Sequence, residues 1–113
     1  MLIKKSQAKE FTIPGKTDGI IYPSSPNKDQ TIARVAIDGN YPEKGWSLND
    51  IATETIYLLT GSIEIDTEDK WEKIEEGDLF MVFPGNKYKI RGKGDCLVFI
   101  TPAWEENNNQ IIQ

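Results

Sequence analysis

The fold of this chain is decided by two stretches, Glu54-Thr-Ile-Tyr-Leu-Leu-Thr-Gly61 and Glu76-Gly-Asp-Leu-Phe-Met-Val-Phe-Pro-Gly-Asn-Lys-Tyr88. Successive side chains of a β-strand point to opposite faces, so Glu54 shares a strand face with Ile56 and Leu58. A glycine follows the first apolar run and a Pro-Gly pair follows the second, and both interrupt strand pairing. We therefore expect two strands, the first of which carries a carboxylate on an apolar face.

Further short strands are predicted on both sides of these stretches. Runs of β-branched and apolar residues between turn signals place strands at 20–22, 31–37, 53–59, 62–66, 79–83, 87–91 and 96–101. The segments 66–70 and 92–94 are predicted to be hairpin turns. Many short strands, glycine and proline punctuation and the lack of a helical period predict an all-β antiparallel barrel or sandwich.

The length of 113 residues fits one domain with a single core. Residues 1–30 are rich in Pro, Gly, Ser and Lys and are predicted to form an N-terminal arm with short strands. Residues 31–104 are expected to form the barrel, including a long loop that carries Tyr41 and Trp46. Residues 105–113 are a polar C-terminal tail, frayed unless its two isoleucines dock on the barrel.

Composition and charge exclude several classes of protein. Thirteen Lys and Arg against eighteen Asp and Glu give a charge of −5 without a basic cluster, so no nucleic acid partner is expected. No apolar stretch approaches the ~20 residues of a membrane span, and the first ten residues lack the apolar core of a signal peptide. We therefore expect a cytoplasmic protein without membrane contact. The single cysteine, Cys96, lies in an apolar run and is predicted to be a buried thiol.

The spacing of the two stretches resembles that of the cupin superfamily, whose fold is a double-stranded β-helix, or jelly-roll barrel. The first family motif has two histidines one residue apart, a glutamate three or four residues later and a glycine after six more, and Glu54 and Gly61 match the last two. The second motif spaces a glycine, a proline, a glycine and a histidine. Gly77, Gly85 and Tyr88 stand at the glycine, glycine and histidine places. The resemblance implies a cupin-type jelly-roll barrel.

The resemblance covers roughly residues 31–104 and departs from the family at the metal ligands. The chain has no histidine, and at the two possible spacings the first-motif histidine places hold Ser47 and Asn49 or Leu48 and Asp50. Zinc, iron, nickel and copper sites draw on imidazole or thiolate ligands, so neither a metal nor another cofactor is expected. A weak Mg²⁺ or Mn²⁺ site made by Asp50 or Asn49 with Glu54 stays open.

The resemblance directs the side chain of Glu54 into the barrel. In one reading Glu54 is solvated or paired with a basic residue, and Tyr88 fills the space that metal and histidines occupy elsewhere. In the other, desolvation raises the pKa of Glu54, which acts as a general acid or base with Tyr88 as its hydrogen-bond partner. Tyr41, Trp46 and Trp104 lie in or beside loops and could line the rim of a pocket.

Three functions remain open. The favoured one is a metal-independent barrel that binds a small polar or aromatic metabolite, as a binding or sensing module or a pathway subunit, through Tyr41, Trp46, Asn49, Glu54 and Tyr88. The second is an acid/base isomerase, epimerase or lyase acting on a small metabolite such as a sugar, with Glu54 and Tyr88 as the catalytic pair. The third is a structural or interaction protein with a self-filled barrel. The resemblance also implies a homodimer.

Overall fold

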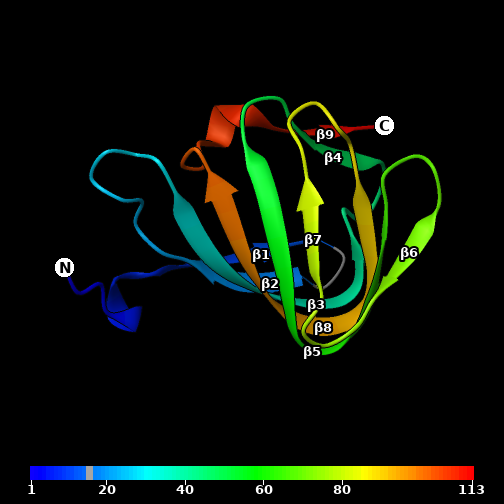
Figure 1. The fold of residues 1–113 in the computed structure, drawn as a ribbon, viewed down its shortest axis with the longest axis horizontal. Helices are drawn as coiled ribbons and strands as arrows, with labels where there is room; N and C mark the ends of the chain where they lie inside the picture. Colours follow the sequence, from blue (N-terminus) through cyan, green and yellow to red (C-terminus); the bar gives the residue numbers. More distant parts are fainter. Residues whose placement is uncertain (15–16) are drawn as a thin grey trace.

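The computed structural model describes residues 1–14 and 17–113, and nearly all of its regular structure is β. Figure 1 shows the strands coloured and numbered along the chain, with a short 3-10 turn near each end of the chain. The strands are β1 (Lys9–Ile13), β2 (Thr17–Ile21), β3 (Thr31–Tyr41), β4 (Trp46–Asn49), β5 (Thr53–Asp66), β6 (Trp71–Ile74), β7 (Leu79–Val82), β8 (Lys89–Thr101) and β9 (Asn109–Ile112), and the turns are η1 (Lys5–Gln7) and η2 (Glu106–Asn108). The all-β prediction is confirmed. None of the helical turns in the described part of the chain has the length and hydropathy needed to cross a membrane.

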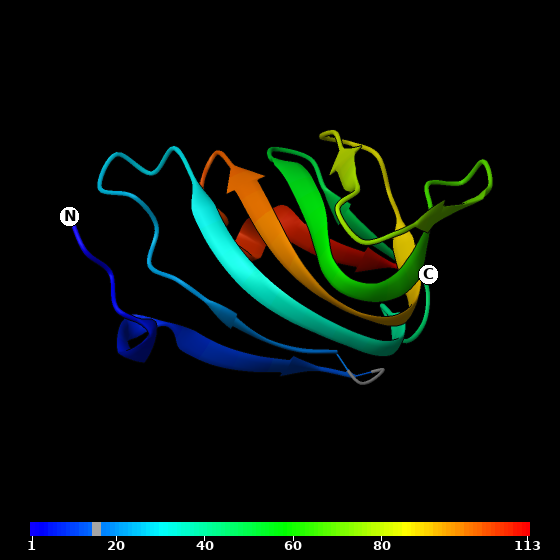
Figure 2. The same ribbon diagram turned by 60° about the horizontal axis from the view of Figure 1, so that its bottom comes forward.

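One large antiparallel sheet forms most of the molecule. Its strand order is β1-β2-β3-β8-β5-β6, and β7 pairs with the first half of β5. The long strands β3, β5 and β8 curve strongly, so that the sheet folds into a deep trough (Figure 2). A second, two-stranded sheet joins β4 to β9. The concave side of the large sheet is therefore the interior of the barrel.

Glycines allow the long strands to bend, and the structure differs here from the sequence prediction. The predicted hairpin turn at 92–94 is wrong, because β8 runs through this segment without a break, and β5 likewise runs through Gly61. Gly61 lies opposite Gly94 and has φ of +95°. A Cβ atom at Gly61 would lie 2.2 Å from the carbonyl oxygen of Lys93. These glycines mark a bend with close backbone approach, and not the ends of strands.

Both terminal segments are part of the folded structure. The predicted N-terminal arm does contain short strands, but they form a β1–β2 hairpin that continues the large sheet, because β2 pairs along its whole length with β3. The C-terminal tail docks through β9, where Ile111 and Ile112 lie opposite Ser47 and Trp46 of β4. The predicted long loop is short, because residue 41 ends β3 and residue 46 begins β4.

The buried core residues are explained by the alternation of side chains between the two faces of each strand. On β5, Glu54, Ile56 and Leu58 are buried, whereas the residues between them are only half-buried. The apolar core extends toward β6 and β7 through Leu58, Ile63, Ile65, Ile74 and Val82, which pack together in the interior. Cys96 is fully buried, as predicted, and burial raises the pKa of its thiol to about 11. The packed core closes one part of the barrel and leaves the rest of the concave side for a cavity.

Candidate functional site

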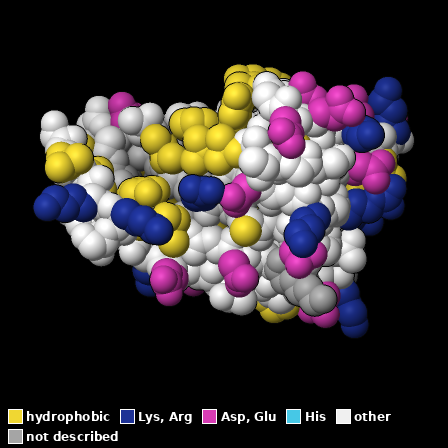
Figure 3. Space-filling view, turned by 90° about the horizontal axis from the view of Figure 1, so that it is seen from below, with side chains coloured by type: hydrophobic (Ala, Val, Ile, Leu, Met, Phe, Trp, Pro, Cys, Tyr) yellow, Lys and Arg dark blue, Asp and Glu magenta, His cyan; other side chains and the backbone are white. Residues whose placement is uncertain are grey.

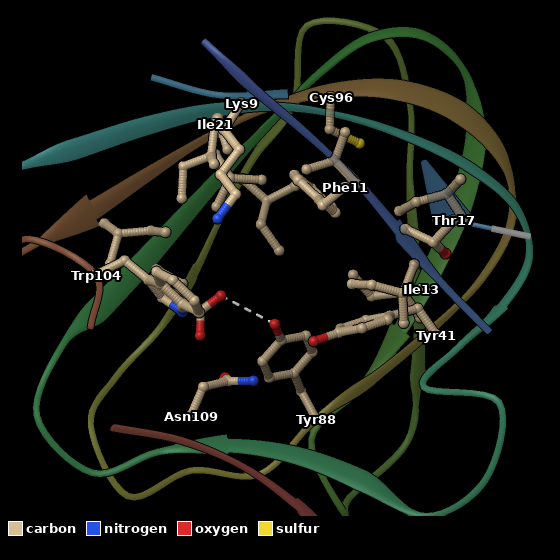
Figure 4. A pocket seen from close by; sticks show the side chains of 18 of the residues that line it. Lys9, Phe11, Ile13, Thr17, Ile21, Tyr41, Tyr88, Cys96, Trp104 and Asn109 are labelled. Atoms are coloured by element: carbon tan, nitrogen blue, oxygen red, sulfur yellow. Dashed lines mark hydrogen bonds between the residues drawn. The ribbon is translucent and has the colours of Figure 1, made fainter. Parts of the chain in front are cut away.

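The barrel contains a cavity of about 360 Å³. Its walls come from the inner faces of β1, β2, β3, β5 and β8, with the C-terminal segment at one side (Figure 4). The apolar lining consists of Phe11, Ile13, Ile21, Ala33, Val35, Ile37, Ile56, Ile90, Val98 and Ile100, with the Cys96 thiol among them. A concave, mostly apolar cavity of a few hundred Å³ with few polar groups is the usual form of a small-molecule site.

A carboxyl group and a phenol meet in this cavity. Glu54 lies near the start of β5, opposite Val82 of β7 on one side and Ile100 of β8 on the other. Tyr88 just precedes β8 and is held by two backbone hydrogen bonds with Ser47, of 2.8 and 2.9 Å. The hydroxyl of Tyr88 donates a 2.9 Å hydrogen bond to Oε2 of Glu54, drawn as a dashed line in Figure 4. The backbone fixes both residues, so the pair is a built feature of the fold.

The environment of Glu54 changes its acidity. Burial raises the pKa of Glu54, and the hydrogen bond from Tyr88 opposes this shift without cancelling it. Among the ion pairs of the described residues none involves Glu54, a residue that is only 7% exposed. Burial and the nearby charge of Glu54 raise the pKa of Tyr88 well above its ordinary value, so the phenol stays a donor at neutral pH. The geometry thus matches the desolvated carboxyl, and not the solvated or ion-paired one.

Tyr41 belongs to the same cluster. It ends β3, and its ring centroid lies 6.2 Å from that of Tyr88 at an interplanar angle of 47°. The hydroxyl of Tyr41 lies 3.2 Å from Oγ of Ser47. Burial is the main cause that raises the pKa of Tyr41. Of the five residues predicted to bind a ligand, the structure brings together Glu54, Tyr88 and Tyr41 in the cavity.

Trp46 does not line the cavity. It begins β4, a strand on which alternate residues are buried, and its side chain lies on the less buried face. The ammonium groups of Lys87 and Lys89 lie 5.2 and 4.2 Å from its ring centroid. These contacts are cation–π interactions at the surface. The predicted ligand contact of Trp46 is therefore not supported by its position.

Asn49 is also absent from the described cavity lining, although it is buried. Its side-chain oxygen Oδ1 accepts hydrogen bonds from the backbone N–H groups of Ile51 and Ala52, at 2.9 and 2.8 Å. This is the arrangement of an Asx turn, which shapes the chain just before β5. Asn49 therefore holds backbone in place, and its oxygen is already used, which also removes it from the oxygen-ligated cation site considered with Glu54.

The sequence prediction missed the residues of the N-terminal hairpin. Lys9, Phe11 and Ile13 of β1 and Thr17 and Ile21 of β2 all line the cavity, and the amine of Lys9 extends into it in Figure 4. The alternation of apolar and polar residues at 10–13 was the available signal. It is too short to tell a strand that faces a cavity from a surface arm. Trp104, expected at a pocket rim, lies in the cavity wall.

Solved structures resemble this chain closely in fold, although no family model and no curated protein matches its sequence. An RmlC-like cupin from Shewanella frigidimarina superposes with a TM-score of 0.73 at 15% identity, over 92% of each chain. The chain has the cupin fold. KdgF from a Halomonas species gives a TM-score of 0.72 at 14% identity, over 95% of this chain and 98% of the KdgF chain.

A closer likeness is to Pac13, described as a unique nucleoside dehydratase. It superposes with a TM-score of 0.88 at 17% identity, over 100% of this chain and 91% of Pac13. Variants of Pac13 from Streptomyces with uridine superpose with TM-scores of 0.88 and 0.89 at 17% identity, over 99% or 100% of this chain and 90% of those chains. At these identities the likeness concerns the fold, and it includes the N-terminal hairpin and the C-terminal strand because it covers the whole chain.

The side chains of this barrel do not fit the metal that many cupin barrels hold. The sequence has no histidine, and among residues 1–14 and 17–113 no three His, Cys, Asp or Glu side chains come together. The place of the last family histidine is filled by Tyr88, whose hydroxyl is bound to Glu54. One carboxyl oxygen and a phenol in an apolar cavity do not make a transition-metal site.

Proposed function

We propose that this cupin is a metal-independent barrel that binds a small, partly aromatic metabolite and recognises a polar group of that metabolite through Glu54 and Tyr88. The observation that carries the proposal is the buried carboxyl–phenol pair inside a cavity of about 360 Å³. Tyr88 uses Oε2 of Glu54, and no described group donates a hydrogen bond to Oε1. That oxygen is available to a ligand donor, while the apolar walls can cover a ring.

Nucleosides are the first class of ligand to test. Their flat base suits walls built from Phe11, Tyr41 and the apolar strand residues, and their hydroxyl groups can donate to a carboxylate. The likeness to Pac13, a nucleoside dehydratase with variants solved with uridine, supports this choice through the shape of the barrel. The self-filled barrel considered from the sequence is at odds with a cavity of this size.

The proposal is tested by binding measurements on four proteins. Wild type, Glu54→Gln and Tyr88→Phe are titrated by calorimetry with uridine and with hits from a thermal-shift panel of nucleosides, sugars and aromatic acids. Glu72→Gln is the matched control, because Glu72 of β6 is exposed and is not among the residues that line the cavity. We expect wild type and Glu72→Gln to bind equally in the presence of EDTA, and Tyr88→Phe to bind at least about tenfold more weakly. A panel without any hit, or binding that needs a divalent cation, would overturn the proposal.

A second function is favoured by the raised pKa of Glu54. A carboxyl group whose pKa is shifted toward the working pH can both take up and release a proton, as a general base and then a general acid. In an isomerisation, the Glu54 carboxylate would remove a proton from a carbon next to a carbonyl group and return it to a neighbouring atom, so that the enzyme ends unchanged. Glu54→Gln should then reduce turnover by about 10²–10⁴-fold while a bound ligand is retained. An activity that survives this substitution would rule out Glu54 as the proton carrier.

We also propose that the protein is a homodimer that pairs through the outer face of the large sheet. Register places Ile32, Phe99, Thr55 and Met81 in one row across β3, β8, β5 and β7, and Leu97, Tyr57 and Leu79 in the next. Leu79 and Met81 are 55% and 49% exposed, and within the described sheet β7 has a partner strand only on the β5 side. Light scattering should give about twice 12.8 kDa, with Met81→Lys shifting the mass toward 12.8 kDa. A wild-type mass of 12.8 kDa at high concentration would contradict the dimer.

A further inference from the structure

Thr17 is a buried polar residue of the cavity wall that lacks a protein partner. Its side chain is 1% exposed and it lines the cavity from the β2 side. Its hydroxyl Oγ1 has no hydrogen-bond partner among the described residues. Buried polar groups in folded proteins are nearly always hydrogen-bonded, because an unpaired one loses its contact with water and gains nothing in return. An orphaned hydroxyl in a cavity therefore suggests that something else completes its bonding.

A second buried threonine shows what a structural role looks like in this fold. Thr31 begins β3 and is 4% exposed, and its Oγ1 accepts a 2.9 Å hydrogen bond from the backbone N–H of Trp104. That bond ties the C-terminal segment to the sheet. The two threonines have the same side chain and similar burial, so their difference lies in the bonding partner alone.

The surroundings of Thr17 define the kind of group that it can bind. In the hairpin register Thr17 lies opposite Ile13, and on its other side it lies opposite Ile37 of β3. Figure 4 shows Thr17 on the same side of the cavity as Ile13, with Tyr41 nearby and Lys9 at the other end of the hairpin. A charged group among these apolar side chains would lose its hydration without a counter-charge. A neutral carbonyl or hydroxyl group suits the site.

We propose that Thr17 is a specificity-determining residue, whose hydroxyl forms a hydrogen bond with a neutral carbonyl or hydroxyl group of the ligand. This inference rests on the proposed function, because it needs a ligand in the cavity. The ligand then has two polar ends, one at Glu54 and Tyr88 on the β5 and β8 side and the other at Thr17 on the hairpin. A nucleoside has this pattern, with hydroxyl groups on the sugar and carbonyl groups on the base.

The test compares Thr17→Val with two matched variants, because valine keeps the shape of threonine and removes the hydroxyl. Thr31→Val removes a hydroxyl that has a structural partner, and Thr12→Val removes a solvated hydroxyl from the outer face of the same hairpin. The melting temperature of each ligand-free protein and its affinity for uridine are measured. We expect Thr31→Val to melt about 4–8 °C below wild type, and Thr17→Val to melt at or above the wild-type temperature. Thr17→Val should bind uridine at least about tenfold more weakly, and Thr12→Val should match wild type in both assays.

Each outcome decides the inference. If ligand-free Thr17→Val melts as far below wild type as Thr31→Val does, the hydroxyl is structural and the inference is overturned, whatever the ligand. If wild type and Thr17→Val bind uridine with equal affinity, the inference fails while the proposed function stands. If wild type binds neither uridine nor any panel compound, the proposed function fails and the inference falls with it. Thr17→Ser, which keeps the hydroxyl, should retain most of the uridine affinity.

Discussion

The two walls of the cavity are built differently. The wall of β5 and β8 holds Glu54 and Tyr88, and β5 has partner strands on both edges, with β8 on one side and β7 and β6 on the other. The opposite wall is the β1–β2 hairpin, whose first strand pairs only with β2 among the described strands. The first wall carries paired polar groups, and the second carries the unpaired hydroxyl of Thr17 and the amine of Lys9.

This difference suggests a division of roles. A strand with two partners is held by more backbone hydrogen bonds than an edge strand and opens less easily. We expect the β5 and β8 wall to carry the stability of the barrel and the fixed geometry of the carboxyl–phenol pair. The hairpin wall is expected to affect ligand affinity more than stability, since it can adjust to its ligand at a smaller cost to the fold.

The largest effect is expected at the bend of the first wall. Gly61→Ala would place a Cβ atom 2.2 Å from the carbonyl oxygen of Lys93 at a φ of +95°, so β5 and β8 would have to move apart. We expect a loss of at least about 4 kcal/mol in the free energy of unfolding, or failure to fold. Urea denaturation measures this loss.

Gly77→Ala is the matched control for Gly61→Ala. Gly77 has φ of +88°, but a Cβ atom there would meet no other atom within 4 Å. Only backbone strain remains, with an expected cost of about 1–2 kcal/mol. Equal losses for the two alanine variants would contradict the idea that close approach of β5 and β8 shapes the barrel.

The next prediction compares one apolar residue from each wall. Ile56→Ala removes a fully buried side chain of β5 and should cost about 2–5 kcal/mol of stability. Phe11→Ala removes a half-buried ring of β1 and should cost about 1–2 kcal/mol. In calorimetric titration, Phe11→Ala should reduce the free energy of ligand binding by more than it reduces the free energy of unfolding. If Phe11→Ala destabilises as much as Ile56→Ala, the hairpin is part of the structural core and the division of roles fails.

A smaller effect is expected from Tyr88→Phe. This variant removes the donor to Oε2 of Glu54 and leaves a buried carboxyl group without that partner. We expect a loss of about 1–3 kcal/mol in unfolding free energy at neutral pH, measured by denaturation. Tyr57→Phe, on the half-buried outer side of the same sheet, should change stability by less than about 0.5 kcal/mol. No loss in Tyr88→Phe would mean that the Tyr88–Glu54 hydrogen bond does not stabilise the fold.

The pH dependence of stability gives the finest comparison. Burial raises the pKa of Glu54 above 4.5, so between 4.5 and the raised value the folded state binds more protons than the unfolded state. Stability therefore falls as pH rises through this window, because the folded state must then ionise a buried carboxyl group. In Glu54→Gln this decrease should disappear. Parallel stability curves for the two proteins from pH 4 to pH 8 would show that Glu54 titrates normally.

Much of the first wall could be predicted from the sequence. The strand pattern indicated an all-β barrel or sandwich, and the resemblance to cupins implied that Glu54 points inward. The hydrogen bond between Tyr88 and Glu54 was one of two readings that the sequence left open, and the structure has this bond. The same reasoning misplaced Trp46 and Asn49. The orientation of Trp46 depends on the pairing of β4 with β9, and that of Asn49 depends on the turn before β5. Neither is a local property of the sequence.

The second wall could not be predicted in the same way. The resemblance to cupins covers roughly residues 31–104, and the hairpin that completes the cavity precedes this range. Its strands are five residues long, and their pairing with β3 depends on contacts between segments distant in sequence. The orphaned hydroxyl of Thr17 is visible only when the packing around it is known. The predicted strand end at Gly61 and the predicted turn at 92–94 were wrong for a related reason, because glycine is the usual residue both in a turn and in a bend within a strand.

Titration of Glu54 by carbon NMR in the ligand-free protein measures whether the barrel holds a desolvated carboxyl group, bonded to a tyrosine, in place of a metal. We expect a pKa for Glu54 above 4.5, and a still higher one in Tyr88→Phe because the hydrogen bond that lowers it is lost. A pKa at or below 4.5, unchanged by Tyr88→Phe, would show that Glu54 is neither desolvated nor held by Tyr88.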